Sequence, residues 1–165
     1  MNSKDIIDLD RSNLSFAVEV STEPGGENIF RCFACGTCTA GCPIARTDSR
    51  FQPSAIIRMV ILGLREQVLW HDAIWLCAGC YTCQERCPQG VNIADLMMAL
   101  RNIATREGYA PEPYHVQLNL LLEKGCLYEI DDFDNKKRVK ADLPEIHIDA
   151  RELRILQEKL LEELD

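Results

Sequence analysis

Two copies of one cysteine pattern constrain this chain more than any other feature. The first copy runs from Cys32 to Pro43 and the second from Cys77 to Pro88, and both have the form C-x2-C-x2-C-x3-C-P. Three cysteines at this pitch can wrap around three corners of a cubane iron–sulfur cluster, while the fourth cysteine reaches the other cluster. The repeated pattern therefore predicts a protein that holds two [4Fe–4S] clusters.

The predicted ligands cross between the two copies. We expect the first cluster to be bound by Cys32, Cys35, Cys38 and Cys87. We expect the second cluster to be bound by Cys77, Cys80, Cys83 and Cys42. Three glycines can let the backbone approach the clusters and adopt angles that a side chain would hinder, namely Gly36, Gly41 and Gly79. Three hydroxyls can donate hydrogen bonds to sulfur, those of Thr37, Thr39 and Thr82.

Zinc is the alternative occupant of such cysteines. Structural zinc sites usually use two separated C-x2-C pairs, so two runs of four cysteines favour iron–sulfur clusters. A zinc-stapled adaptor that only mediates assembly remains open as an alternative. The ninth cysteine, Cys126, stands alone, and we expect it to be a small core residue.

Charge and hydropathy exclude several classes of function. The net charge of −8 argues against nucleic acid as a partner, because binding to phosphates needs a basic surface. The longest apolar run, residues 56–64, is far shorter than the roughly 20 residues that span a bilayer, so we expect no direct membrane insertion. The first residues have no secretory pattern, which favours a cytoplasmic location.

The pattern of apolar residues predicts a mainly α-helical fold. Helices are expected over residues 53–64, 66–76, 92–107, 113–125 and 149–164. In the third of these, one helical face collects Leu96, Met97, Leu100, Ile103 and Ala104. We expect a strand over residues 14–20, an extended segment over 126–133 and a turn at 135–137. The domain division is then an N-terminal extension (1–28), a dicluster domain (29–125) and a C-terminal extension (126–165).

The last predicted helix is amphipathic, with a leucine stripe formed by Leu153, Leu156, Leu160, Leu161 and Leu164. Such a stripe packs either on its own domain or against another subunit. The sequence does not distinguish between the two interpretations.

The residues between and after the cysteines resemble the α-helical ferredoxin domain found in the C subunit of heterodisulfide reductase. The resemblance covers roughly residues 28–130 and is carried by CFACGTCTAGCP, QPSAIIRMVILGL, CAGCYTCQERCPQGVNIADLMMALRNIA and EKGCLYE. It implies an α-helical ferredoxin-like dicluster fold with short irregular or β-like terminal extensions. It also implies a small component of a larger hetero-oligomeric oxidoreductase complex.

By this resemblance the chain relays electrons between two partners in a heterodisulfide reductase-like complex. One is the A subunit, which carries FAD and iron–sulfur clusters, and the other is the B subunit, which reduces a disulfide. The B subunit is typified by a repeated Cys-Cys-Gly motif, and this chain has no adjacent cysteines, so we expect it to conduct electrons without catalysing a reaction itself. The alternative is the iron–sulfur subunit of a flavin-dependent dehydrogenase of the glycolate/lactate or succinate/fumarate type.

Overall fold

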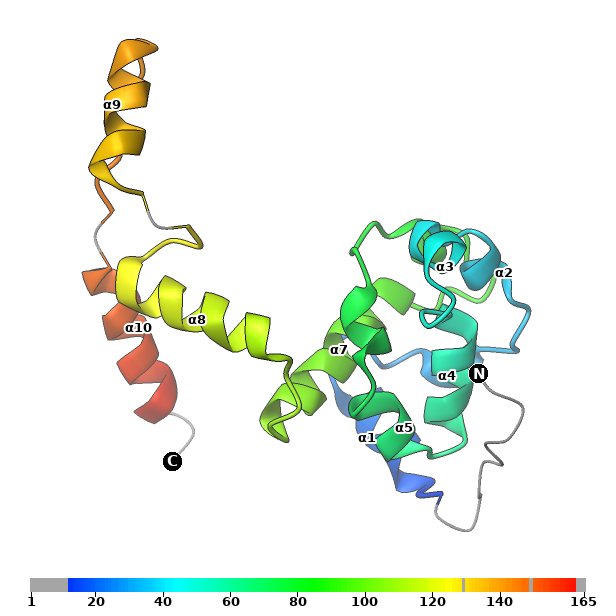
Figure 1. The fold of residues 1–165 in the computed structure, drawn as a ribbon. Helices are drawn as coiled ribbons and strands as arrows, with labels where there is room; N and C mark the ends of the chain where they lie inside the picture. Colours follow the sequence, from blue (N-terminus) through cyan, green and yellow to red (C-terminus); the bar gives the residue numbers. More distant parts are fainter. Residues whose placement is uncertain (1–11, 129, 149, 163–165) are drawn as a thin grey trace. The chain divides into compact units, whose positions relative to one another are not determined.

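A computed structural model describes residues 12–128, 130–148 and 150–162. These residues form α-helices and short 3-10 helices, and they contain no β-strand (Figure 1). The prediction of a mainly α fold is therefore confirmed. The described residues also include no helix with the length and apolar character needed to cross a membrane.

The chain divides into two compact units, of which the first ends at Ala110 and the second begins at Pro111. The first unit contains both cysteine runs, and the second contains the last three helices. The domain boundaries predicted from the sequence, at residues 28/29 and 125/126, remain a proposal about how the chain is organised.

The first unit consists of short helices arranged as two similar halves. Their bounds are α1 (Ser15–Thr22), η2 (Ile29–Arg31), α2 (Thr37–Ala40), α3 (Pro43–Thr47), α4 (Pro53–Ile61), α5 (Arg65–Leu69), η3 (Asp72–Leu76), α6 (Thr82–Glu85) and α7 (Ile93–Arg106). In each half a 3-10 helix leads into a cysteine run, the run contains a short helix, and a longer helix, α4 or α7, follows. The repeat in the sequence is thus a repeat of structure.

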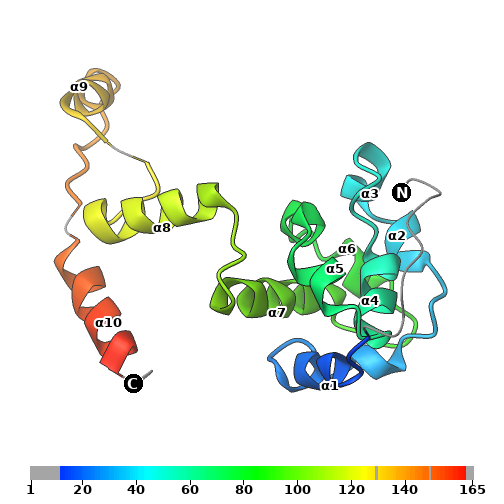
Figure 2. The same ribbon diagram turned by 60° about the horizontal axis from the view of Figure 1, so that its bottom comes forward.

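The prediction of a strand near the N-terminus is wrong, because residues 15–22 form α1. The alternation of apolar residues there is too short to define a strand. The buried side chains instead follow a helical spacing, with Phe16, Ala17 and Val20 almost inaccessible to solvent. Through this face α1 packs against α4 and α7 (Figure 2).

The segment between the cysteine runs matches its prediction only in part. The helix predicted from Pro53 is confirmed as α4, with the proline in the first turn, where its missing N–H costs nothing. The single helix predicted over 66–76 is wrong, because α5 ends at Leu69 and the chain resumes as η3. His71 separates the two, since its backbone is extended and its Nδ1 accepts a hydrogen bond from the Ala73 N–H at 3.1 Å.

Helix α7 supplies a large share of the buried core. Its predicted apolar face is confirmed, and all five side chains are at most 1% exposed: Leu96, Met97, Leu100, Ile103 and Ala104. Each fully buried leucine, isoleucine or methionine contributes about 1.5–3 kcal/mol to folding. Since α7 contacts α1, α5, η3 and α6, its burial fixes the elements that surround the second cysteine run.

Arg65 connects three helices of this unit. Its guanidinium forms ion pairs with Glu19 of α1 and with Glu107, which follows α7, and it lies 5.0 Å from the ring centroid of Phe16. These carboxylates raise the pKa of the arginine, which remains charged at every accessible pH. Because the side chain is only 27% exposed, the charge pairs are partly shielded from water.

We expect Arg65→Met to lower the free energy of unfolding by about 2 kcal/mol, because hydrogen bonds to charged groups are among the stronger ones. The measurement is the thermal unfolding midpoint of the anaerobic protein. Arg50→Met is the matched control, since Arg50 is exposed and its ion pair with Asp48 lies within one turn of chain. A midpoint for Arg65→Met equal to that of the control would contradict the connecting role.

The second unit contains α8 (Glu112–Lys124), α9 (Asp132–Lys140) and α10 (Arg151–Glu162). Helix α8 agrees with the prediction for 113–125, and α8 contacts α10. The predicted turn at 135–137 is wrong, and the predicted extended segment is interrupted by α9. That helix begins with a capping box, in which the side chains of Asp131 and Asp134 each accept a hydrogen bond from the other's backbone N–H.

The leucine stripe of the last predicted helix lies partly outside the described residues. The backbone of α10 agrees with the predicted helix, and Leu156 is exposed while Leu153 is half-buried. The side chains of Leu160 and Leu161, and the whole of Leu164, lie outside the description. Both interpretations of the leucine stripe, packing on its own domain and docking on another subunit, therefore stay predictions.

Candidate metal centres

The two cysteine runs fold in the same way. Cys32 directly follows η2 and Cys77 directly follows η3, so each run begins where a 3-10 helix turns into extended backbone. The third cysteine of each run, Cys38 or Cys83, lies on the short helix α2 or α6 and is buried. The second cysteines, Cys35 and Cys80, are exposed.

Both loops pass twice through the left-handed region of backbone conformation, at the same two positions. In the first loop these residues are Ala34, with φ of 59°, and Gly36, with φ of 77°. In the second loop they are Gly79 and Tyr81, each with φ of 60°. Alternation of left-handed with other conformations turns successive backbone N–H groups toward a common concavity, an arrangement used at many iron–sulfur sites. The glycine predictions are thus confirmed for Gly36 and Gly79.

Gly41, by contrast, has an ordinary helical conformation, with φ of −87°. The expectation that it adopts angles hindered by a side chain is therefore wrong. What it provides is space, because a Cβ at this position would lie 3.2 Å from the Nη1 atom of Arg86.

We expect Gly36→Ala to lower the free energy of unfolding by about 1–2 kcal/mol, the cost of a left-handed conformation for a residue with a Cβ. Apart from the adjoining residues, no atom of the described chain lies within 4 Å of the added methyl group, so the effect is conformational and the clusters should still assemble. Ala34→Gly is the opposite change at the partner position and should not destabilise the loop. Thermal midpoints and iron content of the two variants check this, and an equal loss of stability in both would contradict it.

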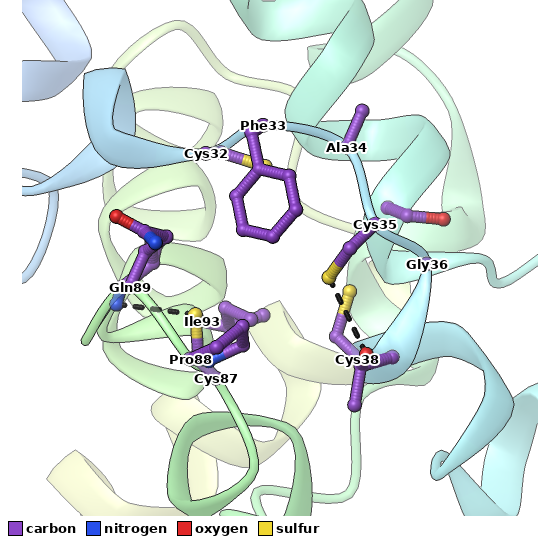
Figure 3. Close-up of a pocket in the computed structure, with 13 residues that line it drawn as sticks. Cys32, Phe33, Ala34, Cys35, Gly36, Cys38, Cys87, Pro88, Gln89 and Ile93 are labelled. Carbon is purple, nitrogen blue, oxygen red and sulfur yellow. Dashed lines mark hydrogen bonds between the residues drawn. The ribbon is translucent and has the colours of Figure 1, made fainter.

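A cavity of about 350 Å³, part of it open to solvent, lies beside the first loop. The cysteines that line it are Cys32, Cys35, Cys38 and Cys87. Figure 3 shows these four side chains around a central space, with the ring of Phe33 directed toward it. Three of the cysteines come from the first run and one from the second.

A second cavity of about 340 Å³ lies beside the second loop. The cysteines that line it are Cys42, Cys77, Cys80 and Cys83. The structure therefore brings together the same two groups of four that the sequence predicts, and the fourth cysteine of each run lies with the other run. Four thiols around one cavity match the four-thiolate donor set of a [4Fe–4S] cluster.

One aliphatic side chain belongs to both cavities. Ile93, the first residue of α7, lines each of them and is only 2% exposed. The wall between the two groups of cysteines is therefore apolar at this point, and it excludes water from the space between them.

Hydroxyl and backbone groups lie close to the cysteine sulfurs. The Oγ1 atom of Thr37 is 3.3 Å from the Cys35 sulfur, and that of Thr82 is 3.6 Å from the Cys80 sulfur. The Val91 N–H donates to the Cys87 sulfur at 3.3 Å. Hydrogen bonds of this kind stabilise thiolates and tune the potential of a bound cluster.

The environment also divides the thiols by their affinity for protons. Hydrogen bonding with the side chains and backbone of Thr37 and Thr82 lowers the pKa of the exposed Cys35 and Cys80 thiols. Burial raises the pKa of Cys38, and burial together with the nearby Cys77 raises the pKa of Cys83 to about 11. Metal coordination deprotonates such thiols outright. The buried Cys38 and Cys83 therefore depend on a bound metal, more than the exposed cysteines do, to lose their protons.

Each short helix is tied to the longer helix that follows it. In the first half, the Thr39 and Ser54 hydroxyl oxygens are 2.7 Å apart, and Thr39 also accepts from the Ser54 N–H. In the second half, Gln84 donates to Asp95 at 3.1 Å. Thr39 and Gln84 occupy the same position, directly after the third cysteine. The sequence analysis did not predict these bonds to Ser54 and Asp95, because they join elements that are distant along the chain. The Thr39 side chain also hydrogen-bonds the Cys38 thiol, in agreement with the prediction for Thr39.

Comparison with protein families identifies the chemistry of this region. Residues 28–91 match the model of a 4Fe–4S dicluster domain, and this segment contains all eight cysteines of the two runs. The chain therefore carries two [4Fe–4S] clusters. The match favours iron–sulfur chemistry over the zinc alternative.

Curated relatives place the whole chain more narrowly. It is 40% identical to the C subunit of the ferredoxin:CoB-CoM heterodisulfide reductase of Methanosarcina mazei, over 73% of this chain and 74% of that protein. The chain belongs to the family of heterodisulfide reductase C subunits. Another member, an iron–sulfur C subunit of the CoB–CoM heterodisulfide reductase of Methanocaldococcus jannaschii, is 37% identical over 84% of this chain and 77% of its own length.

The extent of the match varies within the heterodisulfide reductase family. The iron–sulfur C subunit of Methanopyrus kandleri is 37% identical over 70% of this chain, and the chain spans 59% of the length of that relative. The α-helical ferredoxin-like fold and the iron–sulfur electron-transfer role expected from the sequence agree with membership of this family.

The ninth cysteine of this heterodisulfide reductase family member takes no part in either cavity. Cys126 lies in the second unit, and its thiol donates to the carbonyl of Tyr128 at 2.6 Å. It is half-buried, so the expectation of a core cysteine is wrong.

Proposed function

We propose that this chain is the electron-relay component of a heterodisulfide reductase-like complex. In this role it passes electrons through its two [4Fe–4S] clusters, between a flavin-containing A subunit and a disulfide-reducing B subunit. The observation that carries the proposal is the composition of the two cavities, each with four cysteines contributed by both runs. Membership of the heterodisulfide reductase family supports the choice of complex.

The ligand assignment is part of the proposal. The first cluster takes Cys32, Cys35, Cys38 and Cys87, and the second takes Cys42, Cys77, Cys80 and Cys83. Each bound cluster accepts and releases one electron at a time. With every cysteine of the two runs used as a ligand, neither cluster keeps an iron position for substrate, which supports conduction rather than catalysis.

The protein around the cavities suits a relay in two respects. Ile93 lines both cavities, so the two centres share part of an apolar wall, which suits electron exchange between them. The exposed Cys35 and Cys80 give each cavity an edge at the surface, where an electron can pass to or from a partner. A relay needs both an internal path and two external edges.

Affinity purification from the organism's own cells, without oxygen, tests the proposal. We expect a flavin-binding subunit and a subunit with repeated Cys-Cys-Gly motifs to co-purify, with about eight iron and eight sulfide ions per copy of this chain. A single flavoprotein dehydrogenase as the partner would favour the alternative of a flavin-dependent dehydrogenase. Stoichiometric zinc without acid-labile sulfide would exclude both forms of relay.

A further inference from the structure

One arginine holds the backbone that leads into the second cysteine loop. Arg101 lies on α7, and its guanidinium donates hydrogen bonds to three backbone carbonyl oxygens in and directly after η3. Nε donates to the Ile74 oxygen at 2.9 Å, and Nη2 donates to the Trp75 oxygen at 3.2 Å and to the Cys77 oxygen at 2.7 Å. The last of these acceptors belongs to a cysteine that lines the second cavity.

The arginine is itself held in place. Its guanidinium carbon lies 5.7 Å from the ring centroid of Trp75, a distance at which a cation and an aromatic face attract each other. Its side chain extends from a helix that buries most of its apolar residues. A planar guanidinium with five donors in a rigid fork can satisfy several carbonyl groups at once, which the single ammonium of a lysine does less well.

The first half of the fold is built differently at the corresponding place. Its 3-10 helix, η2, closes on itself, with Cys32 N–H donating to the Ile29 oxygen at 3.1 Å. Helix α4 contacts η2 as α7 contacts η3, but the only basic residue of α4, Arg58, is exposed. Arg31 precedes Cys32 and is also exposed, so water screens its charge.

Both effects of Arg101 act on the second cavity. The three hydrogen bonds fix the position of the Cys77 backbone. The positive charge lies against the backbone of a cysteine that lines this cavity, where a bound cluster becomes more negative when it takes up an electron. Net charge and hydrogen bonding near the ligands are the main means by which a protein shifts the potential of an iron–sulfur cluster. A partly buried cation is screened less than one at the surface.

We propose that Arg101 is a positioning residue for the second cluster, which it retains by fixing the Cys77 loop and whose reduction potential it raises. The inference rests on the proposed ligand assignment and goes beyond the relay function, because it makes the two centres unequal. Helix α7 thereby contributes to the electron path as well as to the core.

The test compares three variants of the full chain, purified without oxygen and titrated by EPR at a series of solution potentials. In Arg101→Gln, we expect the ratio of reduced to oxidised second cluster to fall about tenfold at a fixed potential, which corresponds to ~59 mV for a one-electron couple. Arg101→Lys keeps the charge but not the fork. We expect it to keep a potential near that of the unmodified protein and to lose iron from the second cluster faster in the presence of a chelator.

Arg106→Gln is the matched control. It removes one positive charge from the same helix, but Arg106 pairs with Glu23 and lies five residues further along, about 7.5 Å along the helix axis. We expect both potentials to stay unchanged in this variant. The two EPR signals are assigned beforehand with Cys35→Ala and Cys80→Ala, each of which removes a predicted ligand of one cluster.

The outcomes separate the inference from the proposed function. Both clusters loaded with unchanged potentials in Arg101→Gln would overturn the inference, as would an equal shift in Arg106→Gln. If Arg101→Gln assembles no second cluster, the chelator assay on Arg101→Lys decides the question. Equal rates of iron loss from the two clusters of Arg101→Lys would overturn the positioning role. Absence of iron and sulfide in the unmodified protein would instead defeat the proposed function before any variant is compared.

Discussion

Cys87→Ala should abolish the cluster of the first cysteine run while leaving the cluster of its own run intact. Cys87 lines the same cavity as Cys32, Cys35 and Cys38, although it is much closer in sequence to Cys83. Removing it leaves three thiols for the first cluster, and four are needed for a stable [4Fe–4S] centre. Iron and sulfide content should fall to about half, because the second cavity keeps all four of its cysteines.

The identity of the lost cluster is established by comparison with variants of central ligands. The EPR spectrum of reduced Cys87→Ala should match that of Cys35→Ala, and Cys42→Ala should match Cys80→Ala. If Cys87→Ala instead matched Cys80→Ala, and Cys42→Ala matched Cys35→Ala, each run would bind its cluster with its own four cysteines. Cys126→Ala is the control for loss of a thiol in general and should keep both signals, since Cys126 is in neither cavity.

Leu100→Ala should cost about 2–5 kcal/mol of folding free energy, the range observed for truncation of buried leucines. Leu100 is fully buried on the face of α7 that packs in the core of the first unit. Closely packed neighbours relax only in part around the space that the shorter side chain leaves. For a unit of this size the thermal midpoint should fall by roughly 10 °C or more.

Met98→Ala is the control for this substitution on the same helix. Met98 is 54% exposed, so its truncation should change the free energy of unfolding by less than about 0.5 kcal/mol. Both variants are measured with their clusters loaded, because metal binding itself stabilises the folded chain. A similar midpoint for the two variants would mean that the exposed and buried faces of α7 have been assigned wrongly.

The candidate site was predictable because its chemistry lies in local spacing. The grouping of Cys87 with Cys32, and of Cys42 with Cys77, follows from how far a fourth cysteine can reach after a three-cysteine loop. The buried face of α7 was predictable for a similar reason, since apolar residues at helical spacing share one face. Neither prediction required knowledge of contacts between distant segments.

The rest of the surroundings depends on contacts that the sequence does not display. Arg101 reaches backbone carbonyls more than 20 residues earlier in the chain, and an arginine on a helix is usually a solvated residue. Tyr81 adopts a left-handed conformation that nothing in its residue type predicts, while its hydroxyl donates to Asp95 at 3.3 Å. Both features appear only once the helices are packed.

Local signals were also misjudged in two places. At residues 14–20, a few alternating apolar residues favoured a strand, but burial against α4 and α7 selects a helix. At 135–137, a polar triplet resembled a turn, whereas the capping box at Asp131 and Asp134 begins a helix that continues through it. In each case the deciding interaction involves residues outside the segment itself.

The crossing of the cysteines between the two cavities has a consequence for biosynthesis. During translation the first run emerges from the ribosome with only three of the thiols that line its cavity, and the missing one, Cys87, follows dozens of residues later. The other cavity likewise lacks Cys77, Cys80 and Cys83 until the second run has been made. Under the proposed ligand assignment, neither cluster can be completed until nearly the whole first unit has been made.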